Sequence, residues 1–427
     1  MTLLTEKGKP GRQPRKLTRR QALQLSGGGL VAASLLRVPP ARAARSIIIG
    51  HQADLTGVLA YAGFWNDRVV KAAVKRVNEA GGIGGAEVVL VTDDTESDAR
   101  TGQRIARKLI DSDKADFLIG SNHSGVAFSS IPIVKESKIL YFPIARAREV
   151  TGDRGNRYVF RSGGNVAQEA QAMVTPELVK AMGKNWVLFF EDYSWGHSLR
   201  DEWTSRLKKY DAKITNVPTP LRTSDYVPYL MNIPKDTTAI FAGLLGADLV
   251  GFAQQFRDTG FASRIKAAAP MVTGITAPDA WANAKGFLTV AEMPVQLKNK
   301  NTEANKQFRQ LIQMEDDGRE VGGKRYPAEN FSDAWEAISW IKRGVEKSGW
   351  KDKNGTADLI KALEGMSVEE SVDFPQGNKT MRAEDHQVFL DHYVRRINEK
   401  GEGVIEHRVP AEECQYPVDM DLRRESI

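Results

Sequence analysis

The sequence predicts an α/β protein of two doubly wound lobes. Three observations point to this fold class. Short β-branched runs alternate with amphipathic helical stretches, the alternation restarts midway along the chain, and 427 residues fit two domains better than one. Strand–helix alternation of this kind is typical of a parallel sheet that helices cover on both faces, in a Rossmann-like arrangement.

The first lobe begins with a buried strand and an amphipathic helix. Helix 65–80 places its valines and alanines on one face, and Gly81 and Gly82 end it. A proline at 132 near the start of the third helix does not break it. The expected strands are 46–50, 88–91, 115–120 and 139–142, and the expected helices are 65–80, 103–110 and 130–137.

The same pattern then repeats in a second unit. Its expected strands are 186–190, 213–217, 239–242 and 265–269, and its expected helices are 166–182, 198–210, 225–231 and 247–259. From about residue 300 the chain turns more helical, with helices expected at 304–314, 331–347 and 358–363. These helices have no obvious strand partners, so we expect them to pack on the lobes.

The N-terminal segment 1–43 has the features of an export signal. It carries nine Lys or Arg against one acid, then a short apolar run (22–36) and the small residues Ala41-Arg42-Ala43. Thr18-Arg19-Arg20 resembles a twin-arginine signal without its usual Phe, so the Sec route stays open. A disordered basic tail is the alternative. We expect a soluble protein exported to the periplasm.

The charge of the remaining chain excludes a nucleic-acid partner. Beyond residue 43 there are 51 basic and 53 acidic residues, so the overall net charge of +6 comes from the signal. The single cysteine, Cys414, excludes intrachain disulfides and cysteine-based zinc sites. The six histidines show no metal-ligand spacing, and no nucleophile elbow or P-loop is present. We therefore expect no enzyme activity, no metal and no cofactor.

Five motifs resemble those of the periplasmic leucine/isoleucine/valine-binding proteins. They occur in the family's order along about residues 47–394, nearly the whole mature chain. The motifs are Ile-Gly-His-Gln-Ala-Asp-Leu-Thr-Gly (49–57), Arg-Val-Asn-Glu-Ala-Gly-Gly-Ile-Gly-Gly (76–85), Asp93-Asp94, Glu-Asp-Tyr-Ser-Trp-Gly (191–196) and Met-Arg-Ala-Glu-Asp-His-Gln (381–387). The resemblance implies lobe one at 46–163 plus 293–376, lobe two at 165–291 plus 378–427, and a multi-strand hinge between them. Parallel sheets bind ligands beyond the carboxyl ends of their strands, so the cleft between the lobes is the expected site.

The resemblance also implies which residues bind the ligand. Ser124, in a loop that leads into a helix, would hold a ligand carboxylate, or it could only cap that helix. Ala145 and Ala147 would offer backbone atoms, or they could form an ordinary turn, and Arg146 and Arg148, which alternate with them, would be solvated. An inward arginine would favour an acid with a second anionic group.

Three further positions follow from the same resemblance. Trp195 would form an aromatic wall, or it could be a core residue. Asp248 would pair with a ligand ammonium, or it could be an ordinary helix-start acid, because Ala247 is in strict register. The family's aromatic residue on the first loop falls on Ala62, with Tyr61 or Phe64 as substitute.

The functional expectation is a transport receptor, monomeric, that binds a small amino acid of the branched-chain type and delivers it to an ABC transporter membrane permease. An amide, urea or aromatic carboxylate is the alternative ligand. A sensor on the same fold is the alternative function.

Overall fold

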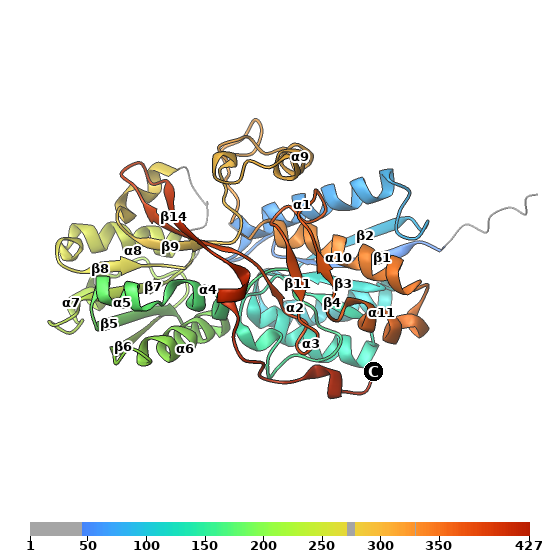
Figure 1. Ribbon diagram of the computed structural model, residues 1–427, viewed down its shortest axis with the longest axis horizontal. Coiled ribbons are helices and arrows are strands. Elements are labelled where there is room, and N and C mark those ends of the chain that lie inside the picture. The colour runs from blue at the N-terminus through green and yellow to red at the C-terminus, as the bar shows by residue number, and fades with distance from the viewer. Residues whose placement is uncertain (1–44, 271–277, 329) are drawn as a thin grey trace, which may run out of the picture. The chain divides into compact units, whose positions relative to one another are not determined.

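The structure is a computed structural model that describes residues 45–270, 278–328 and 330–427. This part of the chain contains two larger β-sheets, each with helices around it, and one small sheet (Figure 1). The predicted export signal, 1–43, lies outside the described residues. None of the described helices has the length and apolar character needed to cross a bilayer.

The first sheet is parallel and has the order β2-β1-β3-β4. Its strands are β1 (Ile47–Ala53), β2 (Val88–Asp94), β3 (Phe117–Gly120) and β4 (Leu140–Phe142). Every residue of β3 and β4 is buried, which requires helices on both faces of the sheet.

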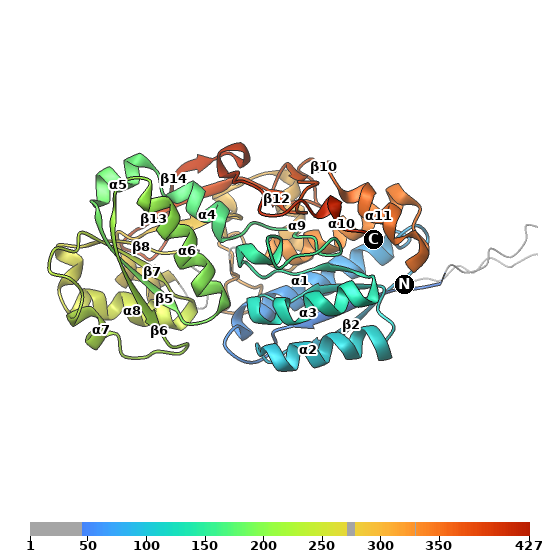
Figure 2. The ribbon, with the colours of Figure 1, turned by 90° about the horizontal axis from the view of Figure 1, so that it is seen from below.

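Five helices cover this sheet. They are α1 (Ala60–Glu79), α2 (Ala99–Arg107), α3 (Ser124–Ser137), α10 (Ser332–Ser348) and α11 (Thr356–Leu363). Helix α1 packs on α10 and α2 packs on α3, on opposite sides of the sheet (Figure 2). The late helices α10 and α11 therefore complete the first lobe, as the sequence predicted for helices without strand partners.

The second sheet has seven strands in the order β14-β13-β9-β8-β7-β5-β6. Its strands are β5 (Asn185–Glu191), β6 (Lys213–Thr219), β7 (Ala239–Gly243), β8 (Lys266–Ala268), β9 (Leu288–Ala291), β13 (His392–Ile397) and β14 (Gly403–Val409). Strands β5 to β9 pair in parallel, whereas β13 is antiparallel to both β9 and β14. The predicted doubly wound class is confirmed, but the sequence did not predict β9, β13 or β14.

The helices of this lobe follow the prediction with one break. They are α4 (Val166–Met173), α5 (Pro176–Met182), α6 (Ser194–Lys208), α7 (Val227–Met231) and α8 (Gly246–Asp258). A single helix was expected at 166–182. Thr175 instead caps α5 by accepting the Leu178 N–H, and Pro176 occupies the first turn, so the chain starts a new helix there.

The remaining elements are short. The antiparallel sheet β10-β11-β12 consists of Ser367–Val368, Lys379–Met381 and Val388–Phe389, and α9 spans Glu303–Leu311. One hydrophobic core draws on residues 47–160 and again on 293–390, while two others draw on residues 166–290 and 394–414. The lobe boundaries given above stay predictions.

Candidate ligand-binding site

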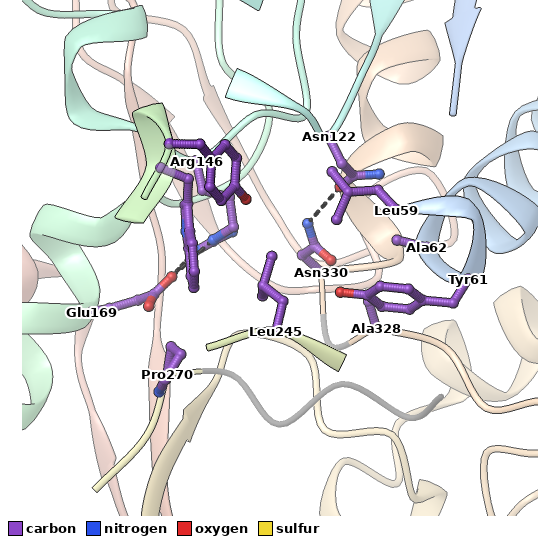
Figure 3. Close-up of a pocket in the computed structure, with 12 residues that line it drawn as sticks. Leu59, Tyr61, Ala62, Asn122, Arg146, Glu169, Leu245, Pro270, Ala328 and Asn330 are labelled. Atoms are coloured by element: carbon purple, nitrogen blue, oxygen red, sulfur yellow. Dashed lines mark hydrogen bonds and ion pairs between the residues drawn. The ribbon is translucent and has the colours of Figure 1, made fainter. Parts of the chain in front are cut away.

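A pocket with a cavity volume of about 40 Å³ lies where loops from both large sheets meet (Figure 3). We call it the main pocket. Its walls come from the carboxyl ends of strands in each sheet, which is where doubly wound folds bind ligands. The lining residues are Leu59, Tyr61, Ala62, Asn122, Arg146, Glu169, Tyr193, Trp195, Leu245, Pro270, Ala328 and Asn330.

Arg146 follows β4 and is buried, with 6% of its surface exposed. Its Nε donates to Glu169 Oε1 at 2.8 Å, and its Nη2 donates to Glu292 Oε1. Its Nη1 lies 3.8 Å from Asp333 Oδ2 and has no hydrogen-bond partner among the described residues. The expectation that Arg146 is solvated is therefore wrong, because three buried carboxylates hold it inside.

The electrostatic balance around Arg146 keeps the guanidinium charged. Burial alone would lower the pKa of Arg146, but the neighbouring Glu292 and Glu169 outweigh burial and raise it. Burial raises the pKa of Glu169 and, together with Glu292, that of Asp333. Arg146, which lines the pocket, is therefore a charged guanidinium with one nitrogen, Nη1, that makes no hydrogen bond to the described residues, and it can pair with an acceptor on a ligand.

Asp54, at the end of β1, holds a loop of the main pocket in place. Its Oδ2 accepts the Asn122 N–H at 2.7 Å, and its Oδ1 accepts the hydroxyls of Thr95 and Ser121. Asn122 Oδ1 in turn accepts from Asn330 Nδ2 at 3.3 Å (Figure 3). Asn122 Nδ2 has no partner within the described part of the chain, so the pocket offers a second free donor.

Aromatic rings form another wall of the main pocket. Tyr193 precedes α6 and Trp195 lies in its first turn, with ring centroids 6.0 Å apart, and Trp195 is 4% exposed. His123 stacks on Tyr193 at 5.2 Å. Burial lowers the pKa of His123 to about 4, so this imidazole is neutral at pH 7. The wall is thus apolar and uncharged, and it can bury a flat or branched ligand body.

A second cavity of about 310 Å³, the side cavity, shares Leu59, Tyr61 and Leu245 with the main pocket. Its further lining residues are Gly57, Val58, Ala60, Glu191, Leu221, Arg222, Gly246, Ala247 and Asp248. Two carboxylates therefore line this cavity. Burial raises the pKa of Glu191 to about 8.

The six residues predicted from the sequence divide into two groups. Tyr61 lines both cavities, Trp195 lines the main pocket and Asp248 lines the side cavity. Ser124, Ala145 and Ala147 are fully buried and line neither cavity. Their ligand contacts, like those of the other three, stay predictions.

Ser124 has a partner within the protein. Its Oγ accepts the Ala147 N–H at 3.3 Å, which ties the start of α3 to the loop after β4. The residue that caps α3 is His123, whose ring accepts the Val126 N–H. The alternative in which Ser124 caps this helix is therefore wrong.

Sequence reasoning missed Asn122, Glu169, Glu191 and the inward side chain of Arg146. Asn122 and Glu191 could have been found, because Asn122 lies two residues after a predicted strand and Glu191 directly follows another. Glu169 lies within a predicted helix, and only the fold brings it to Arg146. Arg148 is half-buried and pairs with Glu202 at 2.7 Å and with Asp419 at 2.6 Å. Among the residues described, no cluster of His, Cys, Asp or Glu could hold a metal ion.

Comparison with known proteins gives consistent matches over the whole α/β region. A family described as "Periplasmic binding protein" matches residues 46–402. The Leu/Ile/Val-binding protein homolog 3 of Brucella melitensis is 28% identical over 341 residues, which cover 76% of this chain and 85% of that protein.

Many solved structures share the fold, including the following two. A solute-binding protein of an ABC transporter from R. palustris, in complex with benzoate, matches with a TM-score of 0.73 and 21% identity, over 86% of this chain and 97% of that one. A branched-chain amino acid transporter substrate-binding protein from Streptococcus pneumoniae, in complex with isoleucine, matches with a TM-score of 0.70 and 16% identity. The match covers 86% of this chain and 99% of that one. At these identities the likeness concerns the fold.

Proposed function

Because the chain belongs to the periplasmic binding protein family, we propose that it is the extracytoplasmic substrate-binding component of an ABC importer. It binds a small amino acid or a related metabolite in the main pocket and delivers it to a membrane permease. It acts by binding and release, without chemistry on the ligand.

One observation carries this proposal: the main pocket combines apolar walls with free buried donors. Asn122 Nδ2 makes no hydrogen bond to the described residues, and Arg146 Nη1 makes none either, with its nearest carboxylate oxygen, Asp333 Oδ2, at 3.8 Å. A buried donor without an acceptor raises the free energy of the folded protein. A ligand carboxylate or carbonyl that accepts a hydrogen bond from such a donor therefore binds more tightly. The lining comes from both large sheets, so a bound ligand would join the two lobes.

A second ligand class is favoured by a specific feature, the aromatic wall. Tyr61, Tyr193 and Trp195 all line the main pocket, and flat rings pack well on such walls. The R. palustris relative in fold was solved with benzoate. Aromatic carboxylates therefore stand beside branched-chain amino acids as candidates, with amides and urea after them.

A ligand screen on the purified mature chain tests the proposal. Leucine, isoleucine, valine, benzoate, 4-hydroxybenzoate, acetamide and urea would be measured by thermal shift and then by calorimetry. A true ligand at a free concentration of 100 times its Kd raises the free energy of unfolding by about 2.7 kcal/mol, which corresponds to a Tm increase of several degrees. Absence of any shift across the whole screen would contradict the receptor function.

We further propose export to the periplasm as a soluble monomer. Fractionation of cells that express the full chain should place the processed protein in the periplasm, and replacement of Arg19 and Arg20 by Lys should retain it inside if the twin-arginine route is used. Gel filtration should give the mass of one copy. A full-length protein that stays in the cytoplasm with both arginines intact would contradict export.

A further inference from the structure

The side cavity adjoins the main pocket but differs from it in hydrogen-bonding character. The two share Leu59, Tyr61 and Leu245, so a ligand longer than a small amino acid could reach from one into the other. The free polar atoms of the main pocket include the donors on Arg146 and Asn122. The side chains that define the side cavity, Glu191 and Asp248, supply acceptors.

Glu191 is the central residue of the side cavity. It ends β5 and is 1% exposed. Its Oε1 accepts the Leu245 N–H at 2.9 Å, while its Oε2 has no hydrogen-bond partner among the described residues. A buried carboxylate oxygen without a donor is costly, so this atom marks a place for a donor that the described protein does not supply.

The other charged groups that line the side cavity also favour a ligand that donates a hydrogen bond to Glu191. Asp248, half-buried at the start of α8, already takes the Arg222 N–H at 2.8 Å, so that backbone donor is used. The guanidinium of Arg222 is the one cation among the side cavity's lining residues, and it is exposed at the surface. The cavity is therefore left with an unfilled acceptor, Glu191 Oε2.

We propose that the ligand has two ends: a carboxylate or carbonyl group held in the main pocket by Arg146 and Asn122, and a primary amine that enters the side cavity and binds Glu191. This inference rests on the proposed function and narrows its ligand class. It selects amino-terminated acids over acids that end in a hydrocarbon or a ring.

Glu169 also lines the main pocket and has a free Oε2, but its charge is offset by the ion pair with Arg146. Glu191 has no such ion pair among the described residues, where its Oε1 accepts the Leu245 N–H and its Oε2 accepts nothing. An incoming ammonium would supply the missing charge. The amine is therefore directed to the side cavity and the acid to the Arg146 end.

Proton release accompanies this binding mode. Burial raises the pKa of Glu191 to about 8, so the carboxyl is protonated at pH 6 and must ionise to pair with an ammonium. Asp248, Tyr193, Tyr226 and Arg222 are the other titratable or charged groups around Glu191. Between pH 6 and 8, affinity for the amine should rise about tenfold per pH unit.

Calorimetry with matched probe pairs tests the inference. The pairs are benzoate with 4-(aminomethyl)benzoate and hexanoate with 6-aminohexanoate. The amine-bearing member should bind at least tenfold more tightly than its parent at pH 8, and only its affinity should depend on pH. Glu191→Gln keeps the shape and the acceptor for the Leu245 N–H, so the fold is retained. It should remove the amine's advantage and its pH dependence, and leave the parent unchanged within about twofold.

Asp192→Asn is the matched control, because Asp192 is the next residue, is exposed, and pairs with His197 outside the cavity. This substitution should change the affinity for neither member of a probe pair. If the wild-type chain binds a compound of the screen but gains nothing from the amine, or if Glu191→Gln weakens parent and amine equally, the inference is overturned while the receptor function stands. If it binds neither the probes nor any screened compound, the receptor function itself fails.

Discussion

Arg146 is the side chain on which the buried charges around the main pocket converge. Glu169, Glu292 and Asp333 each contribute a carboxylate oxygen within 3.8 Å or less of its guanidinium. Such a group is costly to remove, because its partners then remain buried without a counter-charge. Arg146 thus links ligand binding and stability in one residue.

Replacement of Arg146 by Gln should lower the free energy of unfolding by about 3–5 kcal/mol, since at least one buried carboxylate loses its partner. Urea denaturation at pH 7 measures this loss. Arg396→Gln is the control, because Arg396 pairs with Glu406 at 46% side-chain exposure and should cost less than about 1 kcal/mol. Equal losses in the two variants would show that the buried network contributes little.

Trp195 should set the affinity of the main pocket. Trp195→Ala removes a buried aromatic wall and should weaken binding of the best screened ligand at least about tenfold, which corresponds to about 1.4 kcal/mol of lost apolar contact. Calorimetry gives the Kd. Phe261→Ala, outside the lining of either cavity, should leave Kd unchanged. An unaltered Kd for Trp195→Ala would place the ligand elsewhere.

The sequence could predict some site residues and not others for physical reasons. Trp195 and Asp248 lie in the first turns of helices that follow strands, and the fold class places such helix starts at the cleft. The side-chain direction of Arg146 depends on Glu169, Glu292 and Asp333, which are 23 or more positions away along the chain. No local pattern shows that pairing, so a solvated arginine was the natural expectation.

At the scale of elements, helix–strand alternation predicted the parallel strands and most of the helices that join them. The alternation did not predict strands that pair antiparallel with strands far away in the sequence. Strand β13 reads His-Tyr-Val-Arg-Arg-Ile and pairs with β9, about 100 residues earlier. The two arginines of this strand interrupt the apolar, β-branched sequence by which strands are predicted. The break between α4 and α5 could have been predicted from the sequence, because Thr175-Pro176 combines a helix cap with a first-turn proline.

Helix α1 is packed against the strand end that holds the pocket loop. A Cβ added at Gly63 would lie 1.9 Å from the Asp54 carbonyl oxygen. Gly63→Ala should therefore push α1 and Asp54 apart, lower the free energy of unfolding by about 1–3 kcal/mol and weaken ligand binding. Thermal and urea unfolding, with calorimetry, measure both effects.

Gly251 on α8 is the matched control, since a Cβ there meets nothing within 4 Å. Gly251→Ala should stabilise the protein by about 0.5–1 kcal/mol, because alanine is the better helix former. A Gly63→Ala variant that behaves like Gly251→Ala would show that the contact with Asp54 relaxes without consequence.

At the scale of the whole molecule, the buried network connects elements of both large sheets. His392 begins β13, Glu292 follows β9, Arg146 follows β4 and Asp333 lies in α10. His392 Nε2 lies 3.4 Å from Glu292 Oε1, and Glu292 in turn pairs with Arg146. The protonation state of one histidine therefore bears on how the two halves of the described chain hold together.

Stability should fall as the pH rises above neutrality. Burial alone would lower the pKa of His392, but the neighbouring Cys414 and Glu292 outweigh it and raise the pKa to about 10. A histidine with a raised folded-state pKa stabilises fully below its unfolded value near 6.5, and this stabilisation is lost as the pH rises towards 10. The loss should amount to at most about 1.4 kcal/mol per pH unit in that window.

Urea unfolding at pH 6, 8 and 10 measures this dependence, and His392→Gln should flatten it. His407→Gln, at an exposed position of β14, should keep the slope of the wild-type chain. The His392 imidazole should also stay protonated in NMR spectra at pH 8, where the buried His51, whose pKa burial lowers to about 4, is neutral. A His392 signal that titrates near pH 6.5 would mean that its proton does not stabilise the folded state and that the ion pair with Glu292 is absent in solution.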